Sequence, residues 1–148
     1  MKLKSQNLAI FYLLAAVLSI YSCASLGIVP DGKIIRNNFS RTYNVDFAYF
    51  HPRLNLALQD YAQRYKGNSF QVVRLGSDAV IIRGLYQGDQ DRGRFPTFIT
   101  IKPMSPQKTW MEIKISSSNP EASAEYLERA AKELFQIVEK GTGVRPQE

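Results

Sequence analysis

Two residues in this sequence could take part in chemistry that no other position offers: a single cysteine, Cys23, and a single histidine, His51. A thiol can be modified covalently, and an imidazole titrates close to neutral pH. With one of each, the chain forms no internal disulfide and has too few Cys and His ligands for a structural zinc site. The neighbours of each residue therefore decide what it can do.

The segment before Cys23 has the composition of an export signal. Met1–Asn7 contains two lysines and no acidic residue, and Leu8–Tyr21 is an uncharged, mostly apolar run of 14 residues. A membrane-spanning helix needs about 20 such residues, so the run is short for a permanent span. A basic head followed by an apolar run of this length is typical of a secretory signal peptide.

The residues Ile20-Tyr21-Ser22-Cys23 resemble the lipobox of bacterial lipoproteins. In that motif an aliphatic residue stands three positions before the modified cysteine and a small residue directly before it. Ile20 and Ser22 match, whereas Tyr21 replaces the small residue that is usual at its position. The resemblance implies that residues 1–22 are a lipoprotein signal peptide and that Cys23 is the lipid attachment site, for example for palmitate. Each buried methylene contributes about 0.8 kcal/mol, so two or three acyl chains hold a protein durably at a membrane.

Two other interpretations of Cys23 stay open. It could be a buried apolar residue at the end of an uncleaved membrane anchor, or the leader could be an ordinary secretion signal. The lipoprotein resemblance also bears on location, because an aspartate after the cysteine favours inner-membrane retention in enterobacterial lipoproteins. Ala24 stands there instead. The expected location is therefore the cell envelope, with the protein anchored in the outer membrane and facing the periplasm.

Hydrophobic periodicity predicts one folded domain at residues 41–141, after a tether at 23–40 and before a disordered tail at 142–148. Alternating and helical patterns define its elements. They are a strand at 42–47, a helix from Pro52 to Lys66 that stops at Gly67, strands at Phe70–Leu75, Ala79–Tyr86, Phe95–Lys102 and Thr109–Ser116, and a helix from Pro120, capped by Asn119, to Lys140. The turn Gly76-Ser77-Asp78 joins the strand Phe70–Leu75 to the strand Ala79–Tyr86.

The order β-α-β-β-β-β-α with short connections predicts an α+β fold. Consecutive strands joined by short loops form an antiparallel sheet, here of about five strands. Each helix has one apolar stripe, so both are expected on one face of the sheet in a two-layer sandwich. Pro96 cannot donate a ladder hydrogen bond, which places it at a strand start or in an edge strand. Such an edge would be open to a partner strand.

The pattern around His51 does not predict catalysis. No nucleophile–base pair is near it in sequence, so a capping or surface role is the simpler interpretation. The alternative is an envelope hydrolase in which His51 meets Asp46 or Asp89 only in the fold. Gly88–Arg94 resembles a calcium loop but lacks the acidic ligand at its end. We therefore expect no catalytic, metal or cofactor site, and no enzyme.

The charge balance is mildly basic. The formal net charge is +6, and omitting Lys2 and Lys4 leaves +4 for residues 23–148. Basic and aromatic residues alternate on the first helix, for example Tyr61, Arg64 and Tyr65, but the two tyrosines are more simply core residues. The leader is expected to direct the protein out of the cytoplasm, and charge with aromatic residues is a weak marker, so no nucleic-acid partner is expected. The expected partners are the membrane, through the lipid anchor, and an envelope protein or an anionic envelope component.

The region from Asn44 to Lys140 resembles small bacterial lipoproteins of uncharacterised function. In these, a strand rich in Tyr and Phe leads into a helix with an Ala-Leu pair, here Ala57-Leu58, and paired strands and a final helix follow. More distantly, it is similar to the accessory lipoprotein of the outer-membrane barrel-assembly machine. The resemblance implies a lipid-anchored, non-catalytic binding or scaffolding module, and transfers no site residue except Cys23.

Overall fold

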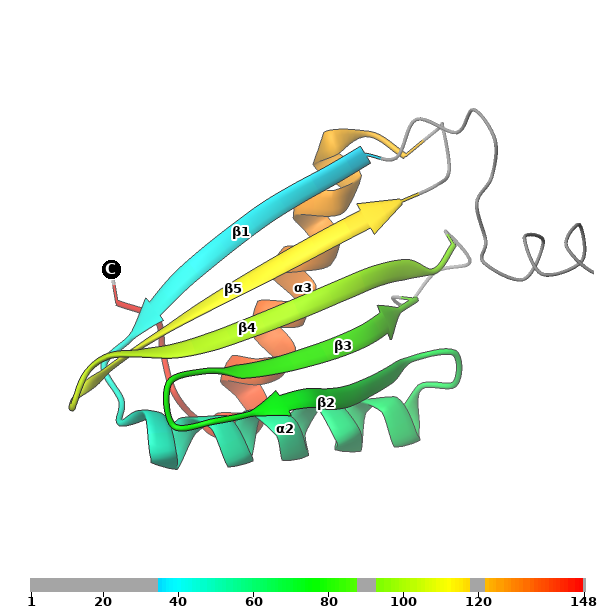
Figure 1. Ribbon diagram of the computed structural model, residues 1–148. Helices are drawn as coiled ribbons and strands as arrows, with labels where there is room; N and C mark the ends of the chain where they lie inside the picture. Colours follow the sequence, from blue (N-terminus) through cyan, green and yellow to red (C-terminus); the bar gives the residue numbers. More distant parts are fainter. Residues whose placement is uncertain (1–34, 88–92, 118–121, 148) are drawn as a thin grey trace, which may run out of the picture. The chain divides into compact units, whose positions relative to one another are not determined.

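The computed structural model describes residues 35–87, 93–117 and 122–147, which form one α+β unit (Figure 1). Five strands and two helices follow one another in the predicted order β-α-β-β-β-β-α. The elements are β1 (Ile35–Tyr43), α2 (Phe47–Arg64), β2 (Ser69–Leu75), β3 (Val80–Tyr86), β4 (Phe95–Ser105), β5 (Lys108–Ser117) and α3 (Ala124–Thr142). The fold class predicted from the sequence is confirmed.

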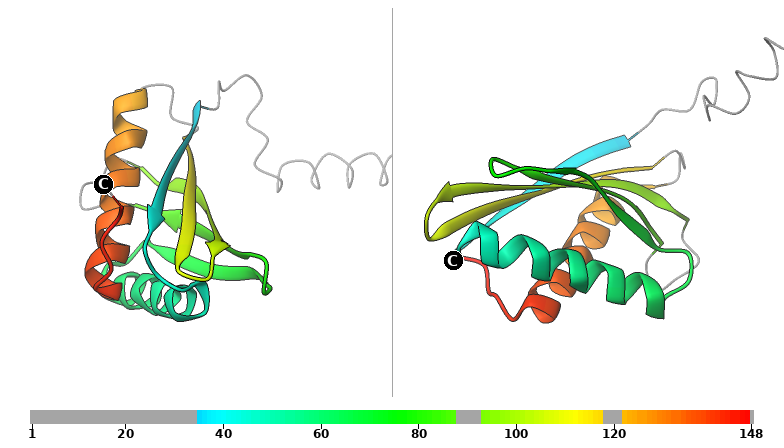
Figure 2. Two further views of the ribbon diagram at one scale, coloured as in Figure 1. Left: turned by 90° about the vertical axis from the view of Figure 1, so that its left-hand side faces the viewer. Right: turned by 60° about the horizontal axis from the view of Figure 1, so that its bottom comes forward.

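The sheet is antiparallel throughout, with strand order β1-β5-β4-β3-β2. Three consecutive hairpins place β2, β3, β4 and β5 side by side, and α2 carries the chain from β1 to the opposite edge. Both helices lie on the same face of the sheet (Figure 2). The sandwich therefore has two layers, and the second face of the sheet is not covered by any element in the described parts of the chain.

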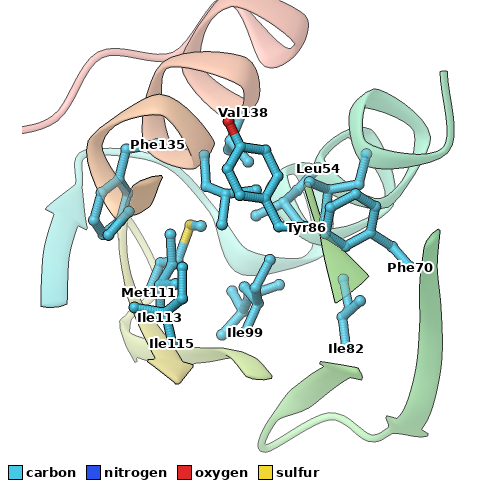
Figure 3. Packing of buried hydrophobic residues seen from close by; sticks show 14 of the residues in the cluster. Leu54, Phe70, Ile82, Tyr86, Ile99, Met111, Ile113, Ile115, Phe135 and Val138 are labelled. Atoms are coloured by element: carbon cyan, nitrogen blue, oxygen red, sulfur yellow. The ribbon is translucent and has the colours of Figure 1, made fainter. Parts of the chain in front are cut away.

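The core fills the space between the sheet and the two helices. Ile82, Ile99 and Met111 point from the strands towards Leu54 of α2 and Val138 of α3 (Figure 3). All five of these side chains are at least 99% buried. Period-two alternation in β4 and β5 puts every second residue into this layer, as the sequence predicts.

The first strand and the first helix begin earlier than predicted. Residues 35–40, assigned to the tether, belong to β1 and pair with β5. Helix α2 begins after Asp46, whose Oδ1 accepts a hydrogen bond from the Tyr49 amide at 2.9 Å, so Pro52 lies inside the helix. The capping carboxylate of Asp46 and the burial of Phe47 favour this earlier start over a start at Pro52.

Pro96 lies at the start of β4, which confirms one of its two predicted placements. The other placement, in an edge strand open to a partner strand, is wrong because β4 is the central strand. The expectations for α3 and for the tail were also wrong. The N-cap of α3 is Ser123, and the helix continues to Thr142, beyond the predicted end at Lys140. Asn119 and Pro120, where this helix was predicted to begin, lie outside the described residues. The tail returns to the sheet, where the Gln147 amide donates to the carbonyl oxygen of Thr42 at 2.8 Å. That contact satisfies an acceptor on the edge strand β1.

The helices approach each other closely near the end of α3. A Cβ atom built on Gly141 would lie 2.4 Å from the Cβ of Ala57 in α2, so only glycine fits there without a shift of the helices. Neither helix, nor any other helix in the described residues, is long and apolar enough to cross a membrane.

Candidate functional site

A hollow between α2 and α3 is the candidate binding site. Its volume is about 480 Å³ and one side is open to solvent. The close contact of Gly141 with Ala57 forms one boundary of the hollow. Tyr86, the last residue of β3, also lines the hollow. Helices packed on a sheet leave such a space where their axes diverge from a contact point, and concave sites with a few polar groups are where small ligands bind.

Three tyrosines form the aromatic part of this hollow. The rings of Tyr61 and Tyr65 are 4.6 Å apart between centroids, and Tyr61 stacks on Tyr86 at 6.2 Å. Tyr65 is 48% exposed, so its ring is available at the mouth. The helical stripe predicts Tyr61 and Tyr65 as core residues, and this prediction is wrong for Tyr65.

Charged side chains of both signs line the hollow together with these rings. Asp60 and Arg64 form an ion pair at 2.7 Å on α2, and Glu133 and Lys140 line the hollow from α3. Two carboxylates and two cations balance in charge, so the hollow as a whole favours neither an anion nor a cation. Gln136 adds an amide that can both donate and accept hydrogen bonds.

The Tyr86 hydroxyl is fixed at the base of the hollow. It donates a hydrogen bond to Oε2 of Glu133 at 2.6 Å, which is short because the acceptor is a carboxylate. Burial raises the pKa of the Tyr86 phenol far above its ordinary value, and the hydrogen bond to Glu133 raises this pKa further. The phenol therefore stays a donor, and the carboxylate is held in one orientation.

The residues singled out in the sequence do not come together in this hollow. Cys23 and Asp89 lie outside the described residues. His51 lies on α2 with its ring 4.9 Å from the ring of Phe47, and burial lowers the pKa of His51 although Asp46 opposes that shift. The Asp46 carboxylate caps the helix. In the described residues no group of three or more His, Cys, Asp or Glu side chains is placed to hold a metal ion.

Sequence reasoning missed Tyr86, Glu133 and Lys140 as site residues. Tyr86 is the last residue of a predicted strand, Lys140 is the predicted end of the last helix, and Glu133 has no assigned role in the sequence pattern. The one usable signal was the pair Tyr61 and Tyr65, four residues apart on one helix and therefore on one face. The spacing of Tyr61 and Tyr65 indicates that both lie on one face of α2. It does not indicate that this face lies beside α3.

No protein-family model matches the chain, and a comparison with curated proteins found no match. Solved structures of similar arrangement exist. An HSP90 activator from Plasmodium falciparum aligns over 76% of this chain and 99% of its own, at 8% identity and a TM-score of 0.46.

Two further structures align with lower scores. An aromatase/cyclase from Streptomyces aligns over 74% of this chain and 87% of its own, at 10% identity and a TM-score of 0.29. A START superfamily protein from Mycobacterium smegmatis aligns over 73% of this chain and 92% of its own, at 9% identity and a TM-score of 0.30. Likeness at this level carries no information on what this chain binds or does.

Proposed function

We propose that this protein is a lipid-anchored, non-catalytic binding module of the bacterial cell envelope, and that its binding site is the hollow between α2 and α3. The observation that carries the binding role is the set of three adjacent tyrosines in an open, charge-balanced hollow. The anchoring role rests on the lipobox-like residues that end at Cys23. An outer-membrane location, facing the periplasm, follows from Ala24 in the same way.

The ligand class proposed for the hollow is a neutral sugar ring of an envelope glycan. A pyranose has an apolar C–H face, which packs on an aromatic ring, and a rim of hydroxyl groups that donate and accept hydrogen bonds. Tyr65 offers an exposed ring, while Glu133 and Gln136 offer acceptors and a donor beside it. The balance of charge in the hollow disfavours strongly charged ligands.

Removing the Tyr65 ring is expected to weaken sugar binding. Chitotetraose, titrated into the protein and followed by amide chemical shifts, should perturb residues of the hollow. Tyr65→Ala should raise the Kd about tenfold, the loss expected for one ring contact of roughly 1.4 kcal/mol. Tyr49→Ala is the matched control, because Tyr49 lies on the same helix outside the hollow and is 47% exposed. Equal losses in both variants, or no shifts in the wild type, would contradict the site.

Cys23→Ser is expected to abolish lipid attachment. Wild type expressed in a Gram-negative host with a labelled fatty acid should take up label and float with the outer membrane, because the thiol is the only attachment point that the lipobox-like motif supplies. The serine variant should carry no label. A variant that stays membrane-bound without label would show that the leader is an uncleaved anchor, and label retained on the variant would exclude Cys23 as the site.

A further inference from the structure

The face of the sheet opposite the helices carries almost all of the excess positive charge of the described elements. We call it the open face (Figure 2). Alternation along the strands, with the core side fixed by the buried residues, places on it one acidic residue, Glu112, and six exposed cations: Arg36, Arg74, Arg83, Lys102, Lys108 and Lys114. Arg74 forms an ion pair with Asp78 of the β2–β3 turn at 2.7 Å, and Lys114 forms one with Glu112 at 3.4 Å. Helices α2 and α3 together carry five acidic and five basic residues, so the helical layer is neutral.

Aromatic side chains lie between these cations. In the register of the sheet, Phe98 of β4 is flanked by Arg83 of β3 and Lys114 of β5. Lys102 lies over the ring of Trp110, with its Nζ 5.9 Å from the ring centroid. Phe98 is 45% exposed. Cations interleaved with an exposed ring, Phe98, and a half-buried ring, Trp110, match the boundary of a membrane, where headgroup phosphates surround the upper part of the acyl chains.

A more exposed apolar residue extends this face at the β4–β5 hairpin. Met104 is 62% exposed, and its sulfur accepts a long hydrogen bond from the Thr42 hydroxyl at 3.9 Å. Pairing of Thr42 with Trp110 puts Thr42 on the open face. Met104, Trp110 and Phe98 therefore give the face side chains that can enter the interface while the cations stay at the phosphates.

The chain before the sheet can bring this face to a membrane. Eleven residues, 24–34, separate Cys23 from the first residue of β1, and an extended chain of that length reaches roughly 40 Å. Arg36 is the first open-face residue of β1. An anchor at Cys23 therefore leaves the open face within reach of the lipid headgroups.

We propose that the open face docks on the anionic phospholipid headgroups of the membrane that holds the anchor. This inference rests on the anchoring part of the proposed function and adds an orientation to it. The sheet lies on the lipid, and the hollow between the helices faces away from the membrane. An acyl chain determines only the distance of the domain from the bilayer, whereas the open face determines which side is presented to envelope ligands.

The test uses residues 33–148, because the whole core lies within this compact unit. Vesicles of phosphatidylcholine alone are compared with vesicles that contain one-third phosphatidylglycerol. Wild type should sediment with the anionic vesicles only, and less as salt rises. The triple variant Arg36→Gln, Arg83→Gln, Lys102→Gln should bind roughly 100-fold more weakly, since each cation near an anionic surface contributes about fivefold.

A matched triple variant separates the effect of where the cations lie from the effect of the change in net charge. Arg53→Gln, Arg129→Gln and Lys132→Gln remove the same charge from exposed positions of the helical layer and should leave vesicle binding close to wild type. Equal loss in both triples, or no vesicle binding by the wild type, would overturn the proposal. Tighter binding to heparin than to the anionic vesicles would also overturn it, because the occupant would then be a soluble polyanion.

Failure of the anchor is distinguishable from failure of the open face. Label at Cys23 together with absent vesicle binding contradicts the docking and leaves the anchor standing. Absent label with intact vesicle binding contradicts the anchor and supports the open face as a membrane contact in its own right. Circular dichroism of both triple variants shows whether each is folded, and the salt dependence of wild-type binding tests the charge argument without any substitution.

Discussion

Glu139→Ala is expected to lower the free energy of unfolding by about 3 kcal/mol. Oε1 of Glu139 in α3 accepts from Nη1 of Arg41 at 2.5 Å and from the hydroxyl of Tyr43 at 3.0 Å, so it ties the edge strand β1 to the helix. Tyr43 is fully buried, and burial, reinforced by Glu139, raises the pKa of its phenol far above the ordinary value. Truncation leaves that hydroxyl and the Arg41 guanidinium without their carboxylate.

Thermal unfolding measures this effect, and a drop in Tm of roughly 10 °C is expected for a domain of this size. The control is Glu128→Ala in the same helix. Glu128 pairs with Lys132 at 2.8 Å, but both side chains are exposed, so the change should stay within about 0.5 kcal/mol. The ion pair of Arg41 is itself partly exposed, and most of the loss is therefore assigned to the buried hydroxyl. Similar effects of the two variants would contradict this assignment.

Gly84→Ala is expected to destabilise the domain by about 2 kcal/mol. Gly84 faces the core from β3, and a Cβ atom there would lie 2.4 Å from Cδ1 of Phe70 and 2.7 Å from Oγ1 of Thr97. Replacing glycine in a strand normally gains about 0.5–1 kcal/mol. The steric cost is larger, because Phe70 is buried and its ring fills the space that the missing side chain leaves.

A double-mutant cycle tests the cause. If the ring of Phe70 is what obstructs the new methyl group, Phe70→Leu with Gly84→Ala should be less destabilising than the sum of the two single changes, by roughly 1 kcal/mol. Urea unfolding of the four proteins gives the coupling energy. Simple additivity, or a stabilising Gly84→Ala, would show that the core at this position is not as closely packed as the structure indicates.

The parts of the fold that depend on local pattern could be predicted from the sequence. Alternation in β4 and β5 and the turn Gly76–Asp78 are local signals, and they predict the sheet and its hairpins. The strand β1 has no such signal, because its core-facing positions include Asn37 and Arg41. Arg41 is accommodated there by Glu139 and by the ring of Phe135, 4.4 Å from its guanidinium carbon. Those partners are about a hundred residues away along the chain.

Helix starts were predicted wrongly for one physical reason. Pro52 and Pro120 predict helix starts because proline is favoured at the first position of a helix. In the structure the capping side chains are those of Asp46 and Ser123. A cap gains a hydrogen bond, whereas a proline only restricts the backbone, so a proline does not determine where a helix begins if a capping residue precedes buried positions.

The hollow could not be predicted, since its residues come from α2, β3 and α3 and meet only through the crossing of the helices. The open face could be predicted in part. Charged residues alternate with core residues in β3, β4 and β5, and the sequence assigns them to the solvated side. The sequence also predicts both helices on one face of the sheet, which leaves the other face free. What the sequence pattern does not show is the strand register, which places Phe98 between Arg83 and Lys114.

The position of β1 at the edge of the sheet has a mechanical consequence. Tension on the proposed lipid anchor would enter the domain at Ile35, and β1 is held to β5 by nine register pairs. Force along the strand axis loads all of these pairs at once, in shear, whereas force perpendicular to the sheet edge peels them one after another. In the proposed orientation, flat on the bilayer, the domain would receive the pull along the strand. The orientation that presents the hollow would then also make the domain resistant to mechanical unfolding.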